Sequence, residues 1–155
     1  MERAQADILM AELGDRLGVP AMALDADGMA LLSIDGDAVV VGVRYDQQSG
    51  AIDLRAGLDD MVPSPARLGR ALSANFSWQL TGGAILALDA ATGRLELRRR
   101  CSGADLDSGR LNEALEDLVA DAVAWSKALR DLPEDGPSAL APADPPKLPF
   151  GSLRA

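Results

Sequence analysis

The 155-residue chain contains no histidine and only one cysteine, Cys101. Without histidine it lacks the side chain that most often acts as a general base near neutral pH, and neither Ser-His-Asp nor Cys-His catalysis can form. One cysteine supplies neither an intrachain disulfide nor the thiolates of a zinc site. The composition therefore predicts a protein that is not an enzyme, with no catalytic residue, no metal site and no cofactor.

Positive charge is also scarce, with 15 Lys and Arg residues against 24 Asp and Glu, a net charge of −9 and a pI near 4.4. A negative field repels phosphate backbones and anionic lipid, so we expect no nucleic-acid partner. No run approaches the roughly 18 apolar residues that span a bilayer, so we expect no membrane insertion. The first residues are polar and unlike a signal peptide, which favours a soluble, cytoplasmic protein.

The remaining candidates for catalytic groups are three pairs of carboxylates and one thiol. The pairs Asp25/Asp27, Asp35/Asp37 and Asp59/Asp60 all lie where turns are expected, and Asp commonly hydrogen-bonds its own backbone there. Cys101 follows Arg99 and Arg100, and neighbouring cations would activate a thiol, but a packed residue at a strand end is the favoured interpretation. An enzyme that uses only carboxylates and arginines remains the minor alternative.

Hydrophobic periodicity predicts a single α+β domain over residues 1–132. The strongest signals are the alternation of Val39, Val41, Val43 and Tyr45 with more polar residues, and an apolar stripe along the last helix. That stripe comprises Leu111, Leu115, Leu118, Ala122, Trp125, Leu129 and Leu132. We expect helices at 7–17, 65–75 and 108–132, strands at 21–24, 29–34, 39–45, 84–88 and 94–100, and a further strand or sheet extension at 52–56.

The composition changes after Leu132. Six of the nine prolines lie in residues 133–155, and such a segment can continue neither a helix nor a sheet ladder. We therefore expect residues 133–155 to form a Pro-rich, flexible C-terminal tail.

Six short segments follow one another along the chain: 13–20 (LGDRLGVP), 24–28 (LDADG), 32–35 (LSID), 72–76 (LSANF), 81–89 (TGGAILALD) and 92–97 (TGRLEL). Taken in order, they resemble the class I chaperones of type III secretion, the Tir-chaperone (CesT-like) family. The resemblance covers about residues 5–131 and implies an α-β-β-β-α-β-β-α order, with a twisted, mainly antiparallel sheet and helices packed on it.

The resemblance also implies a function. Such a chaperone is a homodimer that binds the N-terminal chaperone-binding region of a secreted effector, keeps it extended and soluble, and delivers it for export. The alternative is a non-catalytic interaction or regulatory module of the same fold, unrelated to secretion. The implied dimer contacts are Leu68, Leu72, Phe76, Ile85 and Ala87. The implied effector contacts are Met10, Leu24, Met29, Leu31, Val39 and Val41, although burial in the core is the more common state for each.

Overall fold

The computed structural model describes residues 1–34, 39–58, 63–103 and 105–132. The expected tail at 133–155 and the pairs Asp35/Asp37 and Asp59/Asp60 lie outside these residues. The order of helices and strands is as predicted. The elements are α1 (Arg3–Leu17), β1 (Met29–Ile34), β2 (Val39–Asp46), β3 (Ala51–Gly57), α2 (Pro65–Phe76), the short 3-10 helix η1 (Trp78–Thr81), β4 (Ile85–Asp89), β5 (Arg94–Cys101) and α3 (Ser108–Arg130).

The expected strand at 21–24 is absent, and that prediction was wrong. The backbone turns at Pro20 and Ala21, where Ala21 has a positive φ of 59°, a conformation that does not belong to a strand, and residues 22–24 pair with no described strand. The three strands that precede α2 are therefore β1, β2 and β3, and residues 52–56 lie in the third of them.

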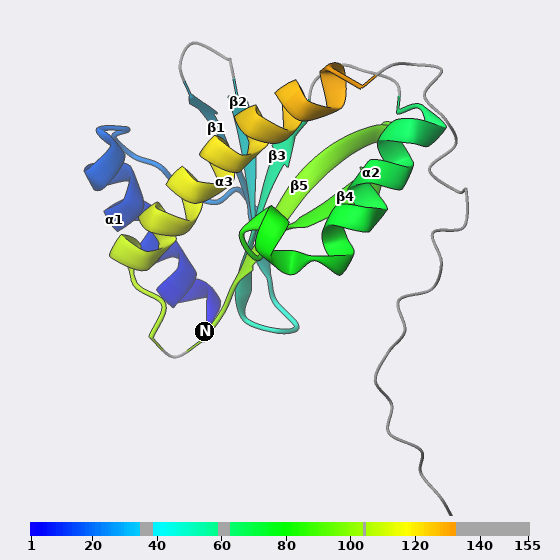
Figure 1. The fold of residues 1–155 in the computed structure, drawn as a ribbon. Coiled ribbons are helices and arrows are strands. Elements are labelled where there is room, and N and C mark those ends of the chain that lie inside the picture. The colour runs from blue at the N-terminus through cyan, green and yellow to red at the C-terminus, as the bar shows by residue number, and fades with distance from the viewer. Residues whose placement is uncertain (35–38, 59–62, 104, 133–155) are drawn as a thin grey trace, which may run out of the picture.

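The strands form one five-stranded antiparallel sheet in the order β1-β2-β3-β5-β4. Figure 1 shows α3 crossing the sheet, α1 beside one half of α3, and α2 next to β4. The strands β1 and β4 are the two edges, and an edge strand offers unpaired backbone groups to any neighbour.

The core lies between α3 and one face of the sheet, here called the inner face. Val41 and Val43 of β2 are buried in it, whereas Val40 and Arg44 point to the other, outer face and are exposed. All the residues of the predicted stripe that lie within α3 are buried, and Leu132 is partly buried. None of the helices described here is long and apolar enough to cross a membrane.

The helix α2 is held to the rest of the molecule mainly by its smaller and charged residues. Ala71 and Ala74 are buried, and the buried Arg67 donates from Nε to the Leu129 carbonyl oxygen at 3.0 Å. The Arg70 guanidinium lies 5.8 Å from the centre of the Trp125 ring. Leu72 and Phe76, two large apolar residues of α2, face outward, whereas Leu68 packs partly against the core.

Two substitutions on α3 separate its buried and exposed faces. Leu118 is fully buried, so Leu118→Ala should lower the free energy of unfolding by about 2–5 kcal/mol. Val123 is 56% exposed, so Val123→Ala should change it by less than about 0.5 kcal/mol. Urea denaturation followed by circular dichroism measures both, and equal losses would contradict this packing.

Candidate peptide-binding groove and sheet edges

The outer edge of β4 is covered by one side chain of α2. The Asn75 amide nitrogen donates to the Leu86 carbonyl oxygen at 2.8 Å, and its amide oxygen accepts from the Leu86 backbone N–H at 2.9 Å. The amide thus occupies both backbone groups of Leu86, as a neighbouring strand would. This edge of the sheet is closed at its centre.

The outer edge of β1 is open. Tyr45 of β2 donates its N–H to the Gly28 carbonyl oxygen at 2.8 Å. This hydrogen bond determines which residues of β1 direct their backbone N–H and C=O groups toward β2. Because antiparallel partners alternate, the backbone groups of Ala30 and Leu32 point toward β2, and those of Leu31 point away from it. Among the described residues no strand lies on that side of β1.

The start of this edge is closed by Asp25. Its backbone N–H donates to the Met29 carbonyl oxygen, and its Oδ1 accepts from the Met29 N–H, both at 2.8 Å. Oδ1 also accepts from the Asp27 N–H at 2.9 Å. The interpretation of Asp25 as a turn residue is therefore confirmed, and the open part of β1 lies at Leu31.

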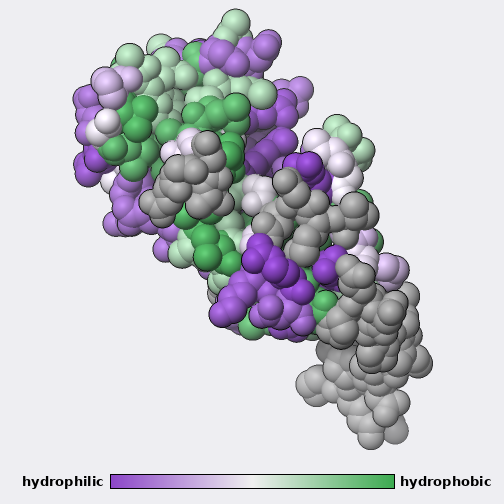
Figure 2. Space-filling view, turned by 90° about the horizontal axis from the view of Figure 1, so that it is seen from above, coloured by the Kyte–Doolittle hydropathy of each residue, from purple (hydrophilic) through white to green (hydrophobic). Residues whose placement is uncertain are grey.

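An apolar groove of about 480 Å³ lies beside the open end of β1, between the end of α1 and the middle of α3. Figure 2, which views the molecule from above, shows apolar surface gathered on this side. An unpaired edge next to apolar pockets is the arrangement that accepts an extended peptide as an additional strand. The groove is lined by Leu17, Val19, Leu32, Ser33, Ile34, Leu115, Glu116, Val119 and Ala120.

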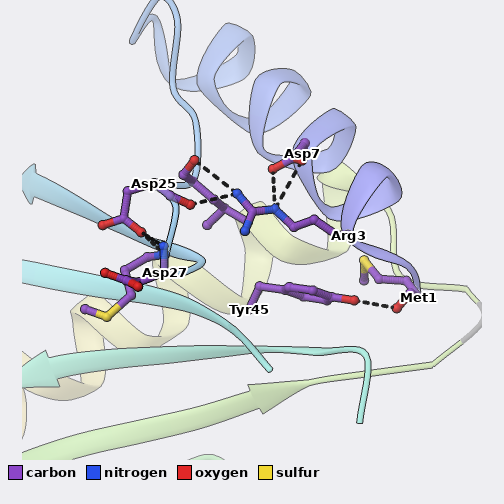
Figure 3. Close-up of polar contacts among 8 residues, drawn as sticks. Met1, Arg3, Asp7, Asp25, Asp27 and Tyr45 are labelled. Atoms are coloured by element: carbon purple, nitrogen blue, oxygen red, sulfur yellow. Dashed lines mark hydrogen bonds and ion pairs between the residues drawn. The ribbon is translucent and has the colours of Figure 1, made fainter. Parts of the chain in front are cut away.

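Polar contacts hold α1 in place as one wall of this groove (Figure 3). Arg3 donates from Nε to Asp7 at 2.9 Å and from Nη2 to the carbonyl oxygens of Leu24 and Asp25 at 3.2 and 2.8 Å. The Tyr45 hydroxyl donates to the Met1 carbonyl oxygen at 2.9 Å. The start of α1 is thereby tied both to the loop before β1 and to β2.

A close approach at Gly14 fixes the other end of α1. A Cβ atom on Gly14 would lie 2.6 Å from Met22 Cβ and 2.7 Å from the Val19 carbonyl oxygen. No residue with a side chain fits there unless the loop moves. Glycine therefore allows the segment that carries Val19 to fold back against α1 and to border the groove.

The structure places the six implied effector contacts in two groups. Met29 and Leu31 are 46% and 77% exposed on the outer face of β1. The other four lie in the hydrophobic core and have no surface to offer a partner, so we withdraw them from the proposed contact surface. They are Met10, Leu24, Val39 and Val41.

The five implied dimer contacts lie on α2 and β4, two elements that touch each other. Leu72, Phe76 and Ile85 are 71%, 85% and 60% exposed, whereas Leu68 and Ala87 are only partly exposed. Leu80 of η1 is 54% exposed and was missed by the sequence analysis. Together these six residues are here called the α2 surface.

The run Arg98–Arg100 forms ion pairs within the subunit. Arg98 contacts Glu96 at 3.4 Å, and Arg99 reaches Asp117 at 3.1 Å and Asp121 at 3.4 Å. Burial raises the pKa of Asp121, and the Arg99 charge opposes that shift. The Arg99 contacts attach β5 to α3.

The Cys101 thiol is buried, and burial raises its pKa, while the nearby Arg99 charge lowers it less. A raised pKa disfavours the reactive thiolate, so the structure gives no support to a nucleophilic role. Among the described residues no group of three or more Cys, Asp or Glu side chains is placed to hold a metal ion.

A sequence model of the Tir chaperone protein (CesT) family matches residues 9–126, so the chain belongs to this family. The family and fold predicted from the sequence are thereby confirmed. Comparison with curated proteins gives no match.

Three solved structures show the same fold. A chain of the ExsC–ExsE complex is 25% identical with a TM-score of 0.74, over 83% of this chain and 97% of that one. A chain of the HopA1–SchA chaperone–effector complex is 19% identical with a TM-score of 0.64, over 77% and 91%. A chain of the ExoT–SpcS complex from Pseudomonas aeruginosa is 19% identical with a TM-score of 0.60, over 80% and 98%.

The closed edge of β4 yields a stability prediction. Asn75→Ala leaves the Leu86 backbone groups without their partner and should lower the free energy of unfolding by about 1–3 kcal/mol. Asn112→Ala, which removes only a surface contact to Glu116, should lower it by less than about 0.5 kcal/mol. Thermal and urea unfolding of the two variants compare them directly, and similar losses would show that Asn75 does not close the edge.

Proposed function

We propose that this protein is a type III secretion chaperone. It binds the N-terminal chaperone-binding region of a secreted effector, keeps that region extended and soluble, and delivers it for export. The observation that carries the proposal is the open edge of β1 beside the apolar groove. Membership of the Tir chaperone family supports it, as does the likeness to a chain of a chaperone–effector complex.

In this proposal the effector segment pairs with the outward backbone groups of Leu31, next to the groove. Every second side chain of the added strand then points to the inner side of the sheet, toward Leu32 and the groove. Holding the segment extended costs conformational entropy, which burial of its apolar side chains between Leu115 and Val119 helps to offset. The protein performs no chemistry of its own.

The α2 surface supports a homodimer as part of the same proposal. Leu72, Phe76 and Ile85 project far from the core, and apolar side chains clustered in this way commonly mark a protein interface. Burying them against a second copy would remove them from water. We place the chaperone domain at residues 1–132 and its site of action in the cytoplasm.

The groove is tested by making the same Val→Glu change at two positions of α3, one inside the groove and one outside it. Val119→Glu puts a carboxylate into the apolar groove and should reduce partner capture at least about tenfold, because the charge has no partner there. Val123→Glu makes the same change on the exposed face of α3 and should leave capture unchanged. The measurement is affinity capture from the native cell, with the retained region mapped by limited proteolysis and thermal unfolding compared for both variants.

Equal capture by the two variants, with both folded, would contradict the groove. A captured partner that is compact and resists proteolysis throughout would favour the alternative of an interaction or regulatory module that binds a folded surface.

The dimer is tested on the α2 surface. Leu72→Glu combined with Phe76→Glu places two like charges on that surface, so the double variant should sediment as a monomer at micromolar concentration where the unmodified chain is a dimer. Val123→Glu, on α3, should remain dimeric. An unmodified chain that is monomeric under these conditions would contradict the dimer.

A further inference from the structure

The outer face of the sheet carries a small hollow next to the open edge. Leu31, Gly42 and Arg55 lie side by side on adjacent strands. A Cβ atom on Gly42 would meet nothing closer than 3.9 Å, where the Leu31 side chain and the Arg55 carbonyl oxygen lie. Gly42 therefore leaves a shallow gap in the row of outward side chains, with room for at least one further carbon atom.

Apolar side chains border this hollow. Leu31 is 77% exposed, and Val40, the next outward residue of β2, is 46% exposed. They lie on the other face of the sheet from Leu32 and the groove of the proposed function. A partner bound to this face and an effector strand bound in the groove would contact different side chains.

Two arginines on the same face form no salt bridge with any described residue. They are Arg44 and Arg55, which point outward from β2 and β3. Asp89 attracts Arg55 only from beyond salt-bridge distance. Arg55 Nε is buried and has no hydrogen-bond acceptor. A buried N–H without an acceptor is unfavourable, so a carboxylate that reached it would stabilise the surface.

The acids on this face are already engaged. Asp53 lies opposite Arg44 in the β2–β3 register, but its carboxylate contacts Arg100 at 3.6 Å. Arg100 also contacts Asp46 at 2.6 Å. Hydrogen bonds from the Ser49 hydroxyl and from Arg100 lower the pKa of Asp46 to about 2. The carboxylates of Asp46 and Asp53 are therefore paired with Arg100, and neither contacts Arg44 or Arg55.

We propose that this outer-face site, formed by Leu31, Val40, Gly42, Arg44 and Arg55, docks an acidic amphipathic segment of another protein. Carboxylates of the segment pair with the two guanidinium groups, and its apolar side chains cover Leu31, Val40 and the hollow at Gly42. Charges are screened beyond about 8 Å at physiological salt, so the local arginines decide binding here although the whole chain carries −9. The same negative charge repels the segment elsewhere on the surface, which gives specificity.

A second copy of this chain fits the outer-face site poorly. A two-fold interface apposes the same patch on both subunits, so it would bring Arg44 and Arg55 of both copies into one interface. Like charges gathered in this way repel each other. The charge therefore selects an acidic partner over self-association through this face.

The test uses two synthetic peptides with the full chain. One is a fluorescein-labelled amphipathic helix of leucine and glutamate, and the other has lysine at every glutamate. The glutamate peptide should bind in a saturable way, and Arg44→Gln with Arg55→Gln should weaken its binding on the order of tenfold, measured by fluorescence anisotropy. Arg110→Gln, which removes an exposed arginine of α3, should leave its binding unchanged.

Two outcomes overturn the proposal: no saturable binding of the glutamate peptide below about 1 mM, or equal affinity for the double variant and the unmodified chain. If the double variant is unfolded by circular dichroism, the exposed Arg44→Gln alone carries the test, with an expected weakening of about threefold. The lysine peptide is the control for charge. If it binds equally well to the unmodified chain and to the double variant, its binding reports attraction to the acidic remainder of the chain. Val119→Glu should not alter glutamate-peptide binding, so failure here is distinguishable from failure of the proposed groove.

Discussion

The apolar stripe of α3 packs across the inner face of the sheet, and the other surfaces of the molecule follow from that contact. Leu111, Leu115 and Leu118 are almost completely buried against the inward side chains of the strands. Because α3 and α1 together cover this face, α2 is left beside the sheet, where it contacts β4 and η1. The outer face carries Met29, Leu31 and Val40 in exposed positions.

The two edges of the sheet are treated differently. The Asn75 amide satisfies the backbone of Leu86 on β4, which limits unwanted strand pairing there. On β1 the turn residue Asp25 satisfies only Met29, and the outward backbone groups of Leu31 face no described strand beside the groove. A chain that holds an extended segment of another protein needs one such edge. Closing the second edge protects the chain against unwanted strand pairing.

Much of the fold was predictable from local patterns. The alternation of Val39, Val41, Val43 and Tyr45 gave the correct buried face of β2, and the seven-residue stripe gave α3, because both patterns record burial within a single element. The loop at 21–24 was taken for a strand, because a short apolar run does not reveal the positive φ of a residue such as Ala21.

The binding surfaces were harder to predict than the fold. Alternation identifies an apolar face of a strand but not whether a helix covers it, so Val39 and Val41 were taken for contact residues although they lie in the core. The groove joins Leu17, Ile34 and Val119 from three elements far apart in the sequence, and no local pattern links them. The outward position of Leu72 and Phe76 was implied only by resemblance to the family.

Amide hydrogen exchange on the complex with a captured effector segment tests the central claim most directly. The Leu31 N–H points to the open edge and should exchange rapidly in the free protein and slowly in the complex, while the Leu32 N–H, bonded to β2, should be protected in both. A Leu31 amide that exchanges equally fast in the complex and in the free protein would show that the partner does not pair with β1.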